Sequence, residues 1–113
     1  SVVAVEEDAQ LAGQARTNLA GTSVELVEGP LTEGHHAGAP YDLILIDGAV
    51  EFVPEALVSQ LADGGRLTAA LLDQGVARIV IGRRAGEGFG MAAISDSAST
   101  ILPGFVRPRV FTF

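Results

Sequence analysis

Runs of aliphatic residues alternate along this chain with short polar and glycine-containing segments. The first run, at residues 2–5, contains small and β-branched side chains, and the strongest run is Leu-Ile-Leu-Ile at residues 43–46. Apolar runs of this length are typical of parallel strands that are covered on both faces. The pattern therefore predicts an α/β protein with a mostly parallel sheet.

The turn and cap signals divide the rest of the chain into further elements. Asp8 is placed to cap a first helix, Gly21 to end it, and Pro54 to begin a second helix that ends at Asp63-Gly64-Gly65. A segment of five residues at 84–88 is too short for a helix, so the strands that it joins are expected to be antiparallel. We predict strands at residues 2–5, 24–28, 41–47, 66–72, 77–82, 89–95 and 109–113, a loop at 29–40 and a turn at 102–105.

Composition narrows the class of protein. The chain has 113 residues, of which 48% are hydrophobic, and this suits one domain, here taken as residues 1–113. It has no cysteine, its net charge is −7, and all seven basic residues are arginines. The negative net charge disfavours nucleic-acid binding. No apolar run is long enough for a membrane span. Because the chain has no cysteine for disulfides, a cytoplasmic location is expected.

Acidic residues stand at the carboxyl ends of two predicted strands. Glu6 and Glu7 follow the first strand, and Asp47 ends the third and precedes Gly48. Ligands of open α/β sheets bind outside the carboxyl ends of strands, where a carboxylate can accept hydrogen bonds from a ribose diol and a small residue admits a ligand to the backbone. The alternatives are solvated acids at a helix N-terminus for Glu6 and Glu7, and an exposed turn acid for Asp47.

Two further motifs could suggest a binding site but are better explained without one. His35 and His36 are adjacent, which rarely lets both ligate one ion, so a solvated loop is the better interpretation and no metal site is predicted. The Gly-Glu-Gly-Phe-Gly segment at residues 86–90 matches a cofactor-loop pattern, but no helical stripe follows it. We interpret this segment as a hairpin turn.

Together, these residues resemble a class I S-adenosylmethionine-dependent methyltransferase, and more narrowly the protein-L-isoaspartate O-methyltransferase family. The resemblance rests on four segments: Val-Ala-Val-Glu at residues 3–6, Tyr-Asp-Leu-Ile-Leu-Ile-Asp-Gly-Ala at 41–49, Val-Pro-Glu-Ala-Leu at 53–57, and Gln-Leu-Ala-Asp-Gly-Gly-Arg-Leu at 60–67. It implies a Rossmann-like methyltransferase sheet with an antiparallel hairpin at its C-terminal end. It also implies S-adenosylmethionine as the cofactor and a carboxylate as the methyl acceptor.

The resemblance also implies roles for particular positions. Glu6 matches the acid that holds the ribose hydroxyls of the cofactor. Gly29-Pro30-Leu31 matches the Gly-Asp-Gly beside the adenine, and Pro30 removes the acidic contact to the adenine amino group. Asp47-Gly48-Ala49 stands where isoaspartyl enzymes usually carry Thr-Ala-Ala, and no catalytic residue can be assigned.

The resemblance begins after the family's first strand and its glycine-rich loop. The chain starts at Ser1 with what matches the second strand, so we expect a sheet that lacks its first strand. We therefore expect the isolated chain to bind S-adenosylmethionine weakly, to be inactive, and to form a homodimer or larger assembly through unpaired strand edges.

Two other classes of function remain open. A response-regulator receiver would use acids near Glu6 and Glu7, a phosphorylated Asp47 and a hydroxyl at Thr68, but it also needs a lysine that this chain lacks. A non-catalytic association module would share the fold of the methyltransferase and lack its chemistry.

Overall fold

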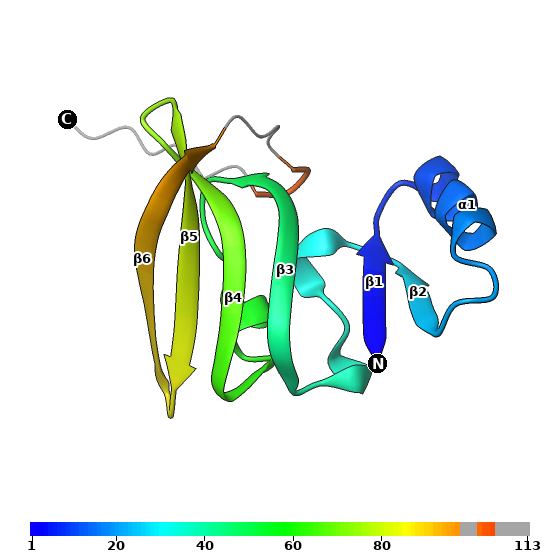
Figure 1. The fold of residues 1–113 in the computed structure, drawn as a ribbon, viewed down its shortest axis with the longest axis horizontal. Helices are drawn as coiled ribbons and strands as arrows, with labels where there is room; N and C mark the ends of the chain where they lie inside the picture. Colours follow the sequence, from blue (N-terminus) through cyan, green and yellow to red (C-terminus); the bar gives the residue numbers. More distant parts are fainter. Residues whose placement is uncertain (98–101, 106–113) are drawn as a thin grey trace.

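A computed structural model describes residues 1–97 and 102–105, so the strand predicted at 109–113 lies outside the described residues. Figure 1 shows two groups of strands with short helical segments around them. In chain order the elements are β1 (Val2–Glu6), α1 (Ala9–Asn18), β2 (Val24–Glu28), the 3-10 turns η1 (Leu31–Glu33) and η2 (His36–Gly38), β3 (Tyr41–Val50), α2 (Glu55–Val58), β4 (Leu61–Asp73), β5 (Val76–Ala85) and β6 (Gly88–Ser97).

The strands form two separate sheets. Strands β1 and β2 make a parallel pair, and the second sheet has the order β3-β4-β5-β6 (Figure 1). The β3–β4 pair is parallel, whereas β4–β5 and β5–β6 are antiparallel. The α/β class and the hairpin before β6 are confirmed, but the antiparallel part is larger than the single hairpin that the sequence predicted.

A two-residue turn explains the additional antiparallel pair. Gln74 and Gly75 connect β4 to β5 with φ angles of 50° and 80°. Positive φ at both central residues is typical of the tight turn that matches the twist of a hairpin. A parallel arrangement would need a crossover connection of a dozen or more residues, and the chain has none here.

The first strand–helix–strand unit follows the sequence prediction closely. Asp8 caps α1 because its Oδ1 accepts hydrogen bonds from the backbone N–H groups of Gln10 (2.9 Å) and Leu11 (3.0 Å). Gly21 follows the helix with a φ of 85°, a conformation that glycine adopts at little cost.

The second helix is shorter than predicted. Helix α2 ends at Val58, and the Asp-Gly-Gly segment at residues 63–65 lies inside β4 and does not terminate the helix. The partner register moves from Tyr41–Leu61 to Leu43–Arg66, so β4 bulges at this segment. The bulge suits glycine because Gly64 has a φ of 76° and a Cβ on Gly65 would lie 2.8 Å from the Ala62 carbonyl oxygen.

The main core lies on one face of the larger sheet. It is built from apolar residues of β3, β4 and β5 together with residues of α2 and the turn at 102–105. Its buried members are Ile46, Val50, Leu57, Leu61, Leu67, Ala69, Val80 and Phe105. In the described part of the chain, no helix is long and apolar enough to cross a membrane.

Candidate cofactor-binding site

The carboxyl ends of β1 and β2 bring Glu6 beside Gly29. The two strands run in parallel register, and the Gly29 N–H donates to the Glu6 carbonyl oxygen at 3.0 Å just beyond the last paired residues. The Glu6 side chain turns back toward α1, and its Oε1 accepts a hydrogen bond from the Asp8 N–H at 3.0 Å. A partly exposed carboxylate and a glycine backbone therefore share one edge, with the exposed Glu7 next in sequence.

The residues after Gly29 turn from this edge toward the core. Pro30 precedes η1 in an extended conformation, with φ −59° and ψ 128°. Leu31 is partly buried and packs against the main hydrophobic core. The loop that follows Gly29 is therefore packed against the protein, because the side chain of Leu31 reaches the core of the second sheet.

Gln60 holds the loop in place, and the sequence prediction missed it. Its side chain is 2% exposed and sits at the junction of α2 and β4. Its Nε2 donates to the carbonyl oxygens of Glu33 (2.7 Å) and Ala56 (2.9 Å), and its Oε1 accepts from the His35 N–H (3.0 Å). The available signal was a polar residue within the otherwise apolar helical pattern before β4.

Tyr41 makes a second connection between the same loop and the sheets. Its hydroxyl donates to the His35 carbonyl oxygen at 2.7 Å, and its pKa is raised by burial of the phenol and by the nearby negative charge of Glu25. His35 Nε2 lies 3.9 Å from Glu25 Oε1 in β2. His35 is thus part of a packed polar contact, in contrast to the solvated loop that the sequence suggested.

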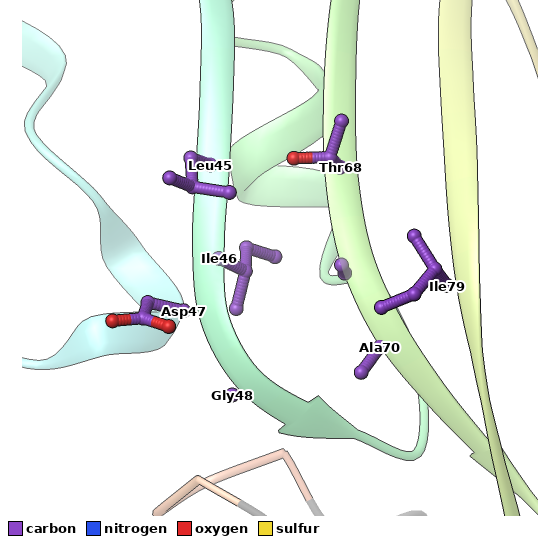
Figure 2. Close-up of a pocket in the computed structure, with 8 residues that line it drawn as sticks. Leu45, Ile46, Asp47, Gly48, Thr68, Ala70 and Ile79 are labelled. Atoms are coloured by element: carbon purple, nitrogen blue, oxygen red, sulfur yellow. The ribbon is translucent and has the colours of Figure 1, made fainter. Parts of the chain in front are cut away.

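Asp47 stands apart from this edge, toward the end of β3. Figure 2 shows its carboxylate pointing away from Thr68 and Ile79, while a shallow cavity of about 160 Å³ is lined by residues of β3, β4 and β5. Asp47 is exposed, and within the described residues its side chain has no hydrogen bond or ion pair. Its carboxylate is therefore available to a ligand.

Gly48 has a packing role that the sequence did not reveal. A Cβ at this position, where φ is 153°, would lie 2.5 Å from Leu102 Cγ. The Leu102 N–H also donates to the Ala49 carbonyl oxygen at 2.7 Å. In this structure, the missing side chain at Gly48 therefore makes room for Leu102.

The predicted site residues fall into two groups. Glu6, Glu7, Gly29, Pro30 and Leu31 are contiguous with the carboxyl ends of β1 and β2, whereas Asp47 and Gly48 belong to the other sheet. Within the described residues, no hydrogen bond or ion pair links the two groups.

The glycine-rich segment at residues 86–90 is confirmed as a hairpin. Strand β5 ends at Ala85, β6 begins at Gly88, and Gly86 has a φ of 59°. Over residues 1–97 and 102–105, no group of three potential metal ligands comes together.

Comparison with known proteins identifies the family. The sequence pattern of the family described as protein-L-isoaspartate(D-aspartate) O-methyltransferase matches residues 1–94. The chain belongs to this family. It is 40% identical over 89 residues to the protein-L-isoaspartate O-methyltransferase of Methanoregula boonei, and 35% identical over 91 residues to that of Halorhodospira halophila. These matches cover 76% and 78% of the chain and 41% of each relative, so the chain spans less than half the length of these curated relatives.

Solved structures agree on the fold. A protein-L-isoaspartate O-methyltransferase superposes with a TM-score of 0.82 at 21% identity over 91% of this chain and 34% of its own. A Plasmodium falciparum protein described as a putative protein-L-isoaspartate O-methyltransferase, in complex with S-adenosyl-L-homocysteine, gives 0.76 at 15% identity over 89% and 51% of the two chains. The Rossmann-like methyltransferase fold predicted from the sequence is confirmed by these likenesses.

Proposed function

We propose that this chain forms part of a methyltransferase that uses S-adenosylmethionine and methylates a protein carboxylate, and that its contribution is the ribose- and adenine-binding edge. The observation that carries the proposal is the contact between Glu6 and Gly29 at the carboxyl ends of two parallel strands, in a member of this family. Ligand sites of open α/β sheets lie at such an edge.

The side chains at this edge fit a nucleoside. Glu6 Oε1 is used by the Asp8 N–H, whereas Glu6 Oε2 has no hydrogen-bond partner within the described residues. An ionised carboxylate accepts hydrogen bonds and donates none, which suits the two hydroxyl donors of a ribose. Gly29 leaves backbone accessible beside it, and the exposed Pro30 offers an apolar surface to the adenine ring, whereas the Leu31 side chain is turned to the core. The cofactor supplies an electrophilic methyl group on its sulfonium.

Asp47 has one of two roles in this proposal: it helps to select the methyl acceptor, or it binds the amino group of the cofactor. Its free carboxylate favours a cation and repels an anion. Gly48 contributes indirectly because Leu102, packed against it, holds the turn at residues 102–105 over the end of β3. In this proposal the acceptor carboxylate is positioned by residues outside the described ranges.

The isolated chain is expected to bind the cofactor poorly. Methyl transfer depends mainly on positioning donor and acceptor, and the edge described above contacts one end of the cofactor only. Isothermal titration of the 113-residue chain with S-adenosylmethionine should give no micromolar affinity, and a methylation assay on an isoaspartyl peptide should give no turnover. Micromolar binding would contradict this expectation.

The decisive test uses the complete protein encoded by the reading frame that contains this chain. It should transfer labelled methyl groups to an isoaspartyl peptide, and Glu6→Gln should weaken cofactor affinity by about tenfold or more, because a charge-assisted hydrogen bond is lost while the bond from Asp8 is retained. Glu87→Gln, in the exposed turn before β6, is the matched control and should leave the affinity unchanged. An unaltered affinity in Glu6→Gln would exclude the proposed ribose contact.

The family match and the antiparallel β4–β5–β6 arrangement favour the methyltransferase over the receiver alternative. A phosphoryl analogue such as beryllofluoride with Mg²⁺ should therefore leave the spectrum of the chain unchanged.

A further inference from the structure

The sequence contains two Asp-Gly pairs, Asp47-Gly48 and Asp63-Gly64. The carboxyl group of an aspartate can react with the backbone nitrogen of the next residue, because the product is a five-membered ring. Glycine favours this reaction, since it has no side chain to shield its nitrogen and its backbone adopts conformations that are closed to other residues. The surroundings of each pair in the fold therefore decide which of them reacts.

The Asp47 carboxylate is free to move. The residue is exposed, and within the described residues its side chain accepts no hydrogen bond and forms no ion pair. Figure 2 shows the carboxylate directed away from Thr68 and Ile79. No such interaction has to be broken before this carboxyl group turns toward the Gly48 nitrogen.

The backbone around this residue is irregular. The aligned residues of β3 jump from Leu45 to Ala49 while those of β4 advance from residue 68 to residue 70, so residues 46–48 bulge out of the pairing. Among the described strands β3 is also at the edge of its sheet, and Gly48 has a φ of 153°, which L side chains rarely adopt. Formation of the ring requires the backbone to leave its extended conformation, and a bulge at a sheet edge opposes this less than a fully paired strand does.

Asp63 precedes a glycine in the same way but is held in place. It is also exposed and lies in the β4 bulge, yet its Oδ1 accepts a hydrogen bond from the Gly86 N–H at 2.8 Å. The start of β4 is fixed as well, because Arg84 Nη1 donates to the Leu61 carbonyl oxygen at 2.6 Å. The Asp63 carboxylate must give up its hydrogen bond before it can react, so this residue is an internal reference for Asp47.

We propose that Asp47 converts spontaneously to isoaspartate in the folded chain, and that Asp63 is protected from the same reaction. In the first step the Gly48 nitrogen forms a bond to Asp47 Cγ, and its hydrogen leaves with the hydroxyl group of the carboxylic acid as water, which gives a succinimide ring. In the second step a water molecule adds to one of the two ring carbonyls and opens the ring. Opening at the main-chain carbonyl leaves the chain running through Asp47 Cβ and Cγ with a free α-carboxylate, whereas opening at Cγ restores aspartate. Water is the only co-reactant, and nothing is oxidised or reduced.

The rearrangement changes the packing at the end of β3. It lengthens the main chain by one methylene group directly before Gly48, whose missing side chain makes room for Leu102. The next residue, Ala49, accepts a hydrogen bond from the Leu102 N–H at 2.7 Å. Conversion of Asp47 should therefore displace the turn at residues 102–105 and lower the stability of the chain.

The test compares the two sites in the 113-residue chain during prolonged incubation at mildly acidic pH. Peptide mapping with electron-transfer fragmentation distinguishes isoaspartate from aspartate, and heavy-oxygen water marks each residue that has passed through the succinimide. In the folded chain, isoaspartate should accumulate about fivefold faster at Asp47 than at Asp63, the factor that one hydrogen bond of ordinary net strength represents. In urea, where neither carboxylate is held, the two sites should react at similar rates.

Two variants separate this site from the other acids of the chain. Asp47→Glu keeps the charge but would need a six-membered ring, which forms far more slowly, so the total isoaspartate of the folded chain should fall several-fold. Asp42→Glu, at an exposed acid of the same strand that precedes Leu43, is the matched control and should leave the total unchanged. Equal rates at the two sites of the folded chain, faster conversion at Asp63, or no isoaspartate at Asp47 would overturn the proposal. None of these measurements depends on methyltransferase activity, so their outcome is independent of the proposed function.

Discussion

Gln60 is the residue whose side chain does most to join distant parts of this chain. It lies 25 and 27 positions from His35 and Glu33, and it hydrogen-bonds the backbone of both. These contacts hold the loop that follows Gly29 against α2, so the shape of the proposed adenine-binding edge depends on one buried amide.

Replacing this amide by an apolar side chain of similar volume should be costly. Gln60→Leu would leave the His35 N–H and the Glu33 carbonyl oxygen without the partner described above, whereas the Ala56 carbonyl oxygen keeps the Ser59 hydroxyl at 2.9 Å. We expect the free energy of unfolding to fall by roughly 2–4 kcal/mol. Urea unfolding followed by circular dichroism measures the change. Gln10→Leu, at an exposed position of α1, serves as the control, and equal midpoints for the two variants would refute the role of Gln60.

Tyr41 provides a pH-dependent measure of the same region. Burial and the charge of Glu25 raise its pKa above the ordinary value of about 10. A raised folded-state pKa means that the folded chain holds this proton more tightly than the unfolded chain does. The stabilisation is complete below the unfolded-state pKa and is lost as the pH rises through the folded-state pKa.

The titration can be followed directly because Tyr41 is the only tyrosine in the chain. The tyrosinate absorbance of the folded protein should develop at higher pH than in urea, and stability should decline over the same alkaline range. Glu25→Gln should lower the folded-state midpoint because it removes the second cause of the shift. Identical midpoints in buffer and in urea would contradict the burial of the phenol.

Among the elements, the turn at residues 102–105 has a larger structural role than its length suggests. Its backbone is hydrogen-bonded to the end of β3, since the Leu102 N–H donates to the Ala49 carbonyl oxygen and the Glu51 N–H donates to the Phe105 carbonyl oxygen, both at 2.7 Å. Phe105 is 1% exposed in the core. The turn therefore closes the covered face of the larger sheet.

Adding a methyl group at Gly48 should displace this turn. Gly48→Ala should destabilise the chain by about 1–3 kcal/mol, because the new Cβ would overlap Leu102. In a double-mutant cycle measured by urea unfolding, Gly48→Ala should cost less in a Leu102→Ala background. Gly90→Ala is the control, since a Cβ there meets nothing within 4 Å. Additive effects of Gly48→Ala and Leu102→Ala would show that the two residues do not interact.

On the scale of the whole molecule, the division into two sheets leaves strand edges without partners. Among the described strands, β1 pairs only with β2, and β3 pairs only with β4. Strands β1 and β3 do not pair with each other in this structure. We propose that these free edges support a homodimer or a larger assembly, because unpaired edges attract further strands.

Light scattering at high protein concentration should therefore give a mass above that of the monomer. The variant Ile81→Lys distinguishes an assembly formed through strand edges from one formed through a face of the β3–β6 sheet. Ile81 lies in the interior strand β5 and not at a free edge. The variant should keep the assembly if strand edges form it. A monomer at every concentration would count against self-association.

Much of the fold could be predicted from local signals. The Asp8 cap, the aliphatic runs of β1 and β3 and the short segment before β6 all act over a few residues, and each was confirmed in place. The bulge of β4 at Gly64 and Gly65 was mistaken for the end of a helix, because a glycine pair signals a change of direction without specifying which element contains it.

The sequence by itself determined the family, the α/β class and the acids at the strand ends, because periodicity, caps and motif spacing are properties of neighbouring residues. Only the tertiary structure decided that Gln60 secures the loop, that Leu102 occupies the space at Gly48, and that the Gly86 N–H holds Asp63. Each of these contacts joins residues far apart in the chain. Their partners are set by sheet register and packing, which local patterns do not encode.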